Sequence, residues 1–316
     1  MTMLRNKYSQ LLAAGLKTIF IEFEKQEMKD GYVDKVFNMM DSKAAYEDDV
    51  IYAGLGPMPE KTENDSFQYN ELTQGGTKRF IHLTYGLGAR YSWELAEDDQ
   101  YGVVKKVPVA LVRSGKFTRE MVPWNVFNLG FTTITTVDGL SIFNNQHPLL
   151  GGPAATGVGP GVANVISAAG TYPNRPSTDV DLSFTAVQLM INHFSRMIDS
   201  NGIPVTYSPQ NIIIPPELQF IAEEIFGSEQ KPYTSDNEKN VLKGKMTPFI
   251  VPYLTSASAW FVTCDKSQHS LRFYNRAPLS QDFDDDFDTD AVKHVAKQRF
   301  SAGCFNWLGT WGSNGP

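Results

Sequence analysis

The chain has 316 residues, a length that corresponds to about two domains and is enough to bury a substantial hydrophobic core. Its 28 basic and 35 acidic residues give a formal charge of −7, which argues against a protein that binds nucleic acid through its overall charge. Charged residues make up only 20% of the sequence, whereas aromatic residues reach 12%. We therefore expect part of the surface to be covered by partners.

The cysteines and the N-terminal sequence limit the compartment. Cys264 and Cys304 support neither a disulfide framework nor a cysteine-rich metal site. The longest apolar stretch near the N-terminus, residues 19–23, is interrupted by Glu22, so we expect neither a signal peptide nor a membrane-spanning helix. A reducing, cytoplasmic compartment fits this pattern best, and no membrane partner is expected.

Two long helices are predicted in the first half. Apolar residues recur at steps of three and four between Leu4 and Phe23, which predicts an amphipathic helix over about the first 28 residues. A second helical spacing covers residues 101–129. Pro108 and Pro123 lie inside it, and because an interior proline costs about 3 kcal/mol we expect kinks or a break at both.

A long β-hairpin is predicted between these helices. Residues 67–73 and 78–93 are rich in Phe, Tyr, Thr and Ile, and Gly75 and Gly76 lie between the two runs. Such runs separated by glycines are typical of a hairpin, so we place its tip near Gly75. Large side chains fall on both of its faces, which suggests that other molecules cover them.

The second half mixes helices and strands, so the predicted fold class is α+β. A glycine-rich segment, residues 151–161, is interpreted as a flexible surface loop. Helices are predicted over residues 184–198 and 217–226. Short strands are predicted at residues 212–214, 249–253, 259–263 and 271–274, followed by an acidic run at 282–290 and a long strand over 292–307.

Motifs for catalysis or cofactor binding are missing. The Gly-Lys pair at 115–116 is followed by Phe117, which excludes a phosphate-binding loop. Aspartates alternate at 284, 286 and 288 as in a calcium loop, but Thr289 and Val295 replace the glycine and glutamate that such a loop needs. His147, before a proline, is interpreted as a turn residue more readily than as a general base. We predict no catalytic residue, no cofactor and no metal.

A series of segments in a fixed order resembles a known family. The resemblance is to the major capsid protein of tailed bacteriophages, in the Mu-like major head subunit group with the Hong Kong 97 fold, and it spans about residues 67–316. It rests on YGLGARYSWELAEDDQY, GVVKKVPVALVRSG, VDGLSIFNNQHPLLGG, NIIIPPELQFIAEEIF, VPYLTSASAWFV, LRFYNRAP and FDTDAVKHVAKQRFSAGCFNWLGTWGS.

The resemblance implies an architecture. Residues 1–40 would be an N-terminal arm, and residues 41–100 an extended loop, formed by the hairpin and its flanks, that lies across a neighbouring subunit. Residues 101–138 and 276–316 would form a peripheral domain with a long spine helix. Residues 139–275 would form an axial domain with a mixed sheet and helices.

The resemblance also implies a function. The chain would be a structural protein, not an enzyme, that assembles with itself as pentamers and hexamers into an icosahedral head shell. The shell would enclose double-stranded DNA without sequence-specific binding, and would assemble in the bacterial host cytoplasm before serving as the virion capsid. Scaffold, portal and decoration proteins are the further partners implied.

Specific residues are assigned to contacts and bending. The expected intersubunit contact residues are Phe67, Tyr69, Lys78, Phe80, Ile81, Leu83 and Tyr85. Glycines at the hairpin tip and base are expected to act as hinges, namely Gly75, Gly76, Gly86 and Gly88. Lys78 is the candidate for a covalent link to an asparagine of a neighbour, as in some capsids of this fold, although noncovalent contact is the default expectation.

Two alternatives remain open at the level of sequence. An encapsulin-like compartment shell shares the implied fold but would enclose cargo enzymes instead of a genome. A soluble α+β hydrolase would instead use an unrecognised site around His147 and the acidic run.

Overall fold

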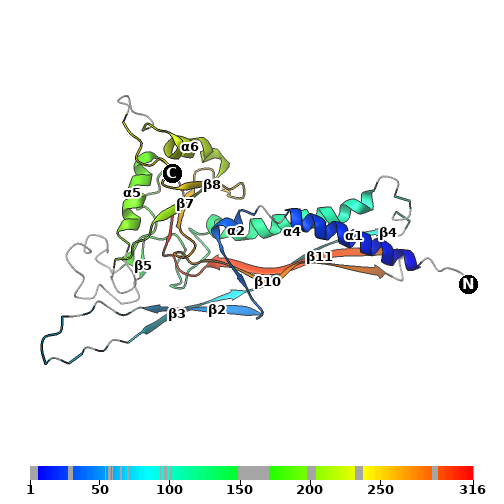
Figure 1. Cartoon of the computed structure of the whole chain (residues 1–316), viewed down its shortest axis with the longest axis horizontal. Helices are drawn as coiled ribbons and strands as arrows, with labels where there is room; N and C mark the ends of the chain where they lie inside the picture. The colour runs from blue at the N-terminus through cyan, green and yellow to red at the C-terminus, as the bar shows by residue number, and fades with distance from the viewer. Residues whose placement is uncertain are drawn as a thin grey trace, which may run out of the picture.

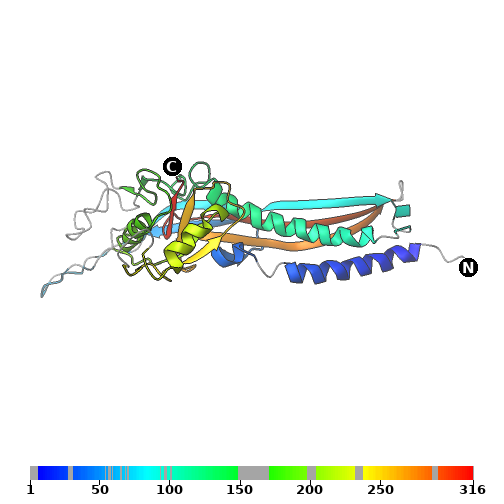
Figure 2. The same cartoon turned by 90° about the horizontal axis from the view of Figure 1, so that it is seen from above.

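A computed structural model shows an elongated molecule, with long strands and helices at one end and a compact group of short elements at the other (Figures 1 and 2). It describes residues 6–27, 31–53, 55, 58, 60–64, 66–67, 69, 71–92, 94–95, 98–99, 102–148, 171–197, 204–231, 238–286 and 291–315. The glycine-rich segment interpreted as a flexible loop, residues 151–161, lies outside the described residues.

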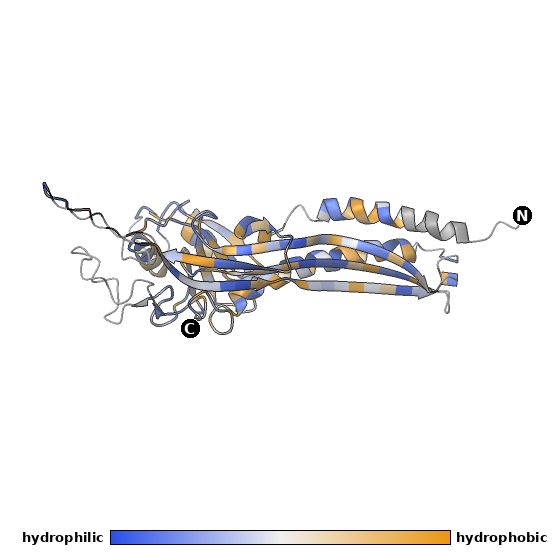
Figure 3. Ribbon diagram, turned by 90° about the horizontal axis from the view of Figure 1, so that it is seen from below, coloured by the Kyte–Doolittle hydropathy of each residue, from blue (hydrophilic) through white to orange (hydrophobic). Residues whose placement is uncertain are grey.

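The elongated end is built on a four-stranded sheet, here called the peripheral sheet, with the order β1-β10-β11-β4. Its central strands β10 (Leu271–Asp286) and β11 (Ala291–Cys304) pair antiparallel. β4 (Leu83–Ser92) pairs antiparallel with β11, and β1 (Asn38–Asp41) pairs in parallel with β10. Hydrophobic and hydrophilic residues alternate along these strands (Figure 3), as expected for a sheet with one covered face. β4 is left as an edge strand.

Helix α4 (Val103–Asn128) covers one face of the peripheral sheet (Figure 2). The break predicted within this helix is wrong, because the helix continues through both Pro108 and Pro123. A proline has a φ angle compatible with a helix, and both rings are buried, so packing offsets the two missing N–H donors. A bend at either proline stays a prediction.

The N-terminal helix predicted from periodicity is confirmed as α1 (Asn6–Glu27), which lies alongside α4 (Figures 1 and 2). Its side chains Leu16 and Phe20 are each only 2% exposed. Phe20 packs in one cluster with Val112 of α4 and Ala296 of β11. Helix α1 therefore packs against α4 and the peripheral sheet of its own chain.

The compact end is built on a second four-stranded sheet, here called the axial sheet, with the order β12-β9-β7-β8. β7 (Pro209–Ile214) lies between β9 (Trp260–Cys264) and the parallel strand β8 (Thr247–Ile250). All five residues of β9 are buried, so this strand is central to the core. Trp260, which is fully buried, is among them.

Helices α5 (Phe184–Ser195) and α6 (Gln219–Gly227) pack on the axial sheet in one hydrophobic cluster with it. The Ser183 hydroxyl accepts the N–H of Ala186 and caps α5, as its sequence position favours. The turn η2 (Pro216–Leu218), with proline at its start, leads into α6. Both predicted helices of this region are thus present.

The C-terminus returns to the axial sheet, which corrects the expected domain division. Residues 276–316 are not all peripheral, because β12 (Thr310–Ser313) pairs antiparallel with β9. Trp307 and Trp311 pack in the axial core, where Trp311 lies 4.6 Å from Trp260 between ring centroids. The burial of these two indole rings favours the return of the chain from the peripheral sheet to the axial sheet.

An aromatic cluster joins the two ends of the molecule. Phe127 of α4 lies 5.2 Å from Phe261 of β9, and Phe143 lies 5.1 Å from the same ring. The short helix α2 (Val33–Val36) packs in this cluster, as does Phe273 of β10. The sheets therefore share a continuous core.

The remaining strands form two small pairs. β2 (Tyr46–Ala53) and β3 (Thr73–Ile81) form a two-stranded ribbon, and β5 (His147–Pro148) pairs with β6 (Thr171–Tyr172). His147 is therefore a buried strand residue, not a turn residue. Within the described part of the chain, no helix is long and apolar enough to cross a membrane.

Candidate assembly surface

The ribbon of β2 and β3 occupies the part of the chain predicted to be the extended loop, but its geometry differs from the predicted hairpin. Gly75 and Gly76 lie inside β3, where the register shift places them opposite Ile51 as a β-bulge. The tip predicted near Gly75 is therefore wrong, because β3 pairs with the preceding strand β2 and the two join through residues 54–72. A side chain at Gly76 would place its Cβ 2.8 Å from the carbonyl oxygen of Val137, which explains the glycine.

The chain leaves the ribbon at His82 and then enters the peripheral sheet as β4. Gly86 and Gly88 pair with Lys297 and Val295 of β11, so they do not lie at a hairpin base. A hinge function for these glycines stays a prediction. The extended loop expected over residues 41–100 is correspondingly shorter, because β4 belongs to the peripheral sheet.

Side chains at the end of β3 alternate between the interior and solvent. Phe80 is 4% exposed and packs on Tyr274 with a ring-centroid distance of 5.3 Å, whereas Ile81 is 62% exposed. Phe80 was expected to contact another subunit, and this is wrong because it contributes to the chain's own core.

Lys78 also points inward and fixes the base of the ribbon. Its Nζ donates hydrogen bonds to the carbonyl oxygens of Thr135 and Cys304, the latter at 2.9 Å. Burial lowers the pKa of this ammonium group below its usual value. Lys78 is thus engaged inside its own chain, which contradicts its expected role at a hairpin tip as a contact or cross-linking residue.

A histidine joins the two ends of the ribbon to the sheet. His82 is 3% exposed; its Nε2 lies 3.0 Å from the hydroxyl of Ser42, before β2, and its Nδ1 lies 2.9 Å from that of Ser301 in β11. Ser42 in turn donates to Glu47 at 2.6 Å. These bonds fix the direction in which the ribbon leaves the molecule.

The ribbon and the described residues of the segment that joins its two strands expose many large apolar side chains. Phe67 is 72%, Tyr69 94% and Met58 98% exposed. We call this set the loop surface; its members are Tyr46, Tyr52, Leu55, Met58, Phe67, Tyr69, Leu72 and Ile81. The sequence pattern identified Phe67, Tyr69 and Ile81 but missed the others, of which Leu55 and Met58 lie among the glycines and prolines of residues 54–59.

The same part of the sequence accounts for most of the chain's net negative charge. Residues 41–72 contain eight acidic and two basic residues, a formal charge of −6 out of the total of −7. Within the ribbon, Arg79 donates two hydrogen bonds to Asp48, at 2.8 and 2.7 Å, and the contact lowers the pKa of this carboxyl group. The loop surface is thus both apolar and acidic.

The two predicted contact residues on β4 differ in exposure. Leu83 is 56% exposed, whereas Tyr85 is partly covered and stacks on Phe300 with a centroid distance of 4.7 Å. Leu83 is available to a partner, and Tyr85 mainly supports the sheet.

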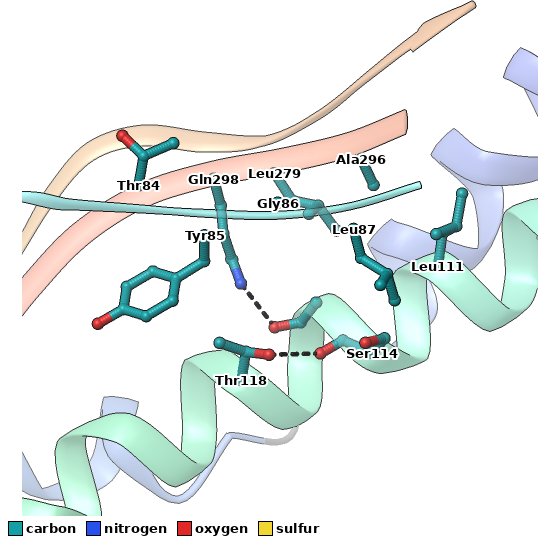
Figure 4. Close-up of a pocket in the computed structure, with 11 residues that line it drawn as sticks. Thr84, Tyr85, Gly86, Leu87, Leu111, Ser114, Thr118, Leu279, Ala296 and Gln298 are labelled. Carbon is teal, nitrogen blue, oxygen red and sulfur yellow. Dashed lines mark hydrogen bonds between the residues drawn. The ribbon is translucent and has the colours of Figure 1, made fainter. Parts of the chain in front are cut away.

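A cavity of about 360 Å³ lies between the edge strand β4 and helix α4 (Figure 4). Gln298 of β11 reaches across it and donates a hydrogen bond to the carbonyl oxygen of Gly115 at 2.8 Å. The lining combines apolar and hydroxyl side chains and comprises Thr84, Tyr85, Gly86, Leu87, Leu111, Ser114, Gly115, Thr118, Leu279, Ala296 and Gln298.

The candidate groups for chemistry serve structural roles. His147 donates through Nδ1 to the Asp138 carboxylate at 2.5 Å and stacks on Trp307 with a ring-centroid distance of 4.7 Å. Both cysteines are buried, and burial raises the pKa of each thiol to about 12. Among the described residues, no group of three or more His, Cys, Asp or Glu side chains could hold a metal ion.

The comparison with protein families decides what kind of protein this is. A family model for phage capsid proteins matches residues 77–312, which are 236 of the 316 residues. The chain belongs to the phage capsid protein family. It is a structural major capsid protein of the head shell, not an enzyme, and it assembles with itself in the virion capsid.

Solved structures share the fold of this capsid protein at low sequence identity. The capsid structure of the cyanophage P-SCSP1u has a TM-score of 0.56 and 10% identity, with 91% of this chain and 89% of that chain covered. A chain of Microbacterium phage Oxtober96 also has a TM-score of 0.56 at 10% identity, with 90% of this chain and 91% of that chain covered. The procapsid of bacteriophage JBD30 has a TM-score of 0.51 at 14% identity, with 97% of this chain and 76% of that chain covered. No curated protein matches the chain. The predicted α+β, Hong Kong 97-like fold is confirmed.

Proposed function

We propose that this capsid protein joins neighbouring copies through its loop surface, in rings of five and six that close the shell. The observation that carries this proposal is the exposure of Phe67, Tyr69 and Met58 on an element that projects from the core (Figure 1). Exposed apolar area costs about 25 cal/mol per Å² relative to burial, and large contiguous patches mark interaction sites.

Assembly in rings requires that each copy offer two different surfaces. A contact between unlike surfaces repeats around an axis and closes when the rotation divides a full turn. The ribbon provides one such surface, and its base is fixed by Lys78, Phe80 and His82. A firm base with an apolar outer part suits a contact that holds subunits at a defined angle.

The shell is proposed to enclose double-stranded DNA without base-specific contacts, and to form in the bacterial cytoplasm. The net charge of −7 favours this, because an acidic protein releases few phosphate counterions and so holds DNA weakly. Scaffold, portal and decoration proteins are the further partners that we propose for such a shell.

Replacing the projecting part of the loop tests the proposal. One variant joins Ala53 to Thr73 through a short Gly-Ser linker, and a second substitutes residues 55–72 by a Gly-Ser segment of equal length. Because none of the described residues between 55 and 72 belongs to the main hydrophobic clusters, both variants should unfold like the wild type in urea. Neither should form shells in negative-stain microscopy. Wild-type-sized shells from the equal-length variant would contradict the proposal.

A further inference from the structure

The cavity between β4 and α4 opens at an edge strand that has no second neighbour in the peripheral sheet. We propose that it receives the Tyr69 side chain of a second copy, an inference that rests on the proposed assembly through the loop surface. The contact joins the most exposed aromatic side chain among the described loop residues to an open cavity beside the edge strand of the peripheral sheet.

The cavity is suited to one aromatic side chain. Its volume of about 360 Å³ exceeds that of a single ring, and small residues such as Gly115 and Ala296 shape its wall. Leu87 lines the cavity and is nevertheless 54% exposed, so the cavity opens at the edge strand β4. An incoming side chain would cover this leucine and remove its apolar surface from water, which is favourable.

The occupant cannot be the chain's own loop. The ribbon of β2 and β3 points away from α4, and the segment beyond it lies at the opposite end of the molecule from β4 and α1 in both views (Figures 1 and 2). The firm base of the ribbon, with Lys78 bound to the carbonyl oxygen of Cys304, keeps this direction. A second copy must therefore supply the side chain.

Tyr69 fits this lining better than its neighbours on the loop surface. The cavity wall carries the hydroxyl groups of Ser114 and Thr118 and the amide of Gln298 beside its apolar groups (Figure 4). A tyrosine fills an apolar space with its ring and meets polar groups with its hydroxyl. Phe67 lacks the hydroxyl and Met58 lacks the ring. Tyr46 and Tyr52 lie on the ribbon strand β2 and are less exposed than Tyr69, at 45% and 61%.

Charge also favours this pairing. Residues 103–119 of α4 contain five basic and no acidic residues, namely Lys105, Lys106, Arg113, Lys116 and Arg119. Residues 41–72, which deliver Tyr69, carry a formal charge of −6. Opposite charges on the two surfaces steer their approach and disfavour the pairing of two loops.

Photo-crosslinking in assembled shells tests the contact. We place p-azidophenylalanine, which is close to tyrosine in size, at position 69, with the same substitution at position 67 as the matched control. Shells assembled from mixed isotope-labelled and unlabelled copies should give crosslinks from position 69 to peptides of β4 or of residues 107–119 in a different copy. Crosslinks from position 69 that map to the axial sheet or its helices would overturn the inference.

A second pair of variants tests the cavity itself. Ser114→Trp fills it, whereas Ala110→Trp places the same ring at an exposed position one turn earlier on α4. Ser114→Trp should reduce shell yield by about tenfold or more, as expected for loss of a central contact, and Ala110→Trp should not. Equal yields would overturn the inference. Failure of the proposed loop function would appear separately, as shells formed by the equal-length loop variant.

Discussion

Adjacent residues of β3 show how one step along a strand separates stability from assembly. Phe80 packs against Tyr274 and Phe305, and a side chain at Gly303 would place its Cβ 2.8 Å from the Phe80 ring, so the site is closely packed. Ile81 points the other way and is 62% exposed. Both residues are large and apolar. They differ in their surroundings because successive side chains of a strand point to opposite faces.

Alanine substitutions at these two positions should therefore affect different properties, the stability of the chain in one case and its assembly in the other. Phe80→Ala should lower the free energy of unfolding by about 3–5 kcal/mol, because it leaves a cavity in a packed cluster. Ile81→Ala should change the unfolding free energy by less than about 0.5 kcal/mol but reduce shell yield. Urea denaturation of the unassembled chain and sedimentation of shells measure the two effects. An equal loss of stability in both variants would contradict the alternation.

At the scale of elements, periodicity predicted the helices well and the loop poorly. In α1 and α5 the apolar residues recur at steps of three and four, a spacing that is typical of an amphipathic helix and not of a strand. The pair Gly75 and Gly76 has the composition of a turn, but here it forms a bulge because Val137 approaches the strand at Gly76. β2 escaped prediction because Glu47, Asp48 and Asp49 are atypical of strands.

A buried carboxylate connects two elements that are distant in the sequence. Glu120 of α4 is 3% exposed, and its Oε2 accepts the backbone N–H groups of Tyr32 and Val33 at 3.1 and 3.2 Å. A side chain at Gly31 would place its Cβ 2.5 Å from Oε1, so only glycine allows this approach. The carboxylate thereby holds the start of α2, which lies within the predicted N-terminal arm, against α4.

Substitutions of Glu120 should depend on pH. Burial raises the pKa of this carboxyl group, so the folded state binds a proton more readily than the unfolded state and loses stability as pH rises from the unfolded pKa through the folded pKa. Glu120→Gln resembles the protonated form, so it should match the wild type at low pH and be at least as stable at pH 7. Glu120→Ala should be less stable by about 1–3 kcal/mol, because the buried N–H groups lose their acceptor.

Urea denaturation across pH 3–8 measures these differences. The Gln variant is the matched control for the Ala variant, since it keeps the side-chain length and an acceptor oxygen. A Gln variant that loses as much stability as the Ala variant at pH 7 would show that the negative charge itself holds α2 in place.

At the scale of the whole molecule, the crossing of chain segments between the two sheets was beyond sequence analysis. Trp307 and Trp311 continue a strand-rich pattern that began in β11, yet they pack beside Trp260 in the axial core. No local sequence pattern shows which sheet these residues join, because aromatic side chains are buried in the cores of both sheets. The cavity between β4 and α4 was equally unpredictable, since its lining comes from four elements far apart in the sequence.

The uneven distribution of charge over the molecule predicts that shell assembly depends on salt. Residues 41–72 carry −6, and residues 103–119 carry five positive charges, so two copies attract each other when the loop of one approaches α4 of the other. Added NaCl shortens the screening length from about 10 Å at 0.1 M to about 3 Å at 1 M and should slow assembly. Buried apolar contacts are screened little, so shells already formed should persist.

Light scattering during assembly and sedimentation of finished shells at increasing NaCl distinguish these two effects. The variant with both Lys105→Gln and Lys106→Gln should assemble more slowly than the wild type at low salt and show a weaker salt dependence, because both residues are exposed and lie on the attracting surface. Lys239→Gln together with Lys243→Gln, on the axial side, removes the same charge elsewhere and should keep the wild-type dependence. Assembly that accelerates steadily with NaCl in all three proteins would show that apolar association, not attraction between the loop and α4, limits the rate.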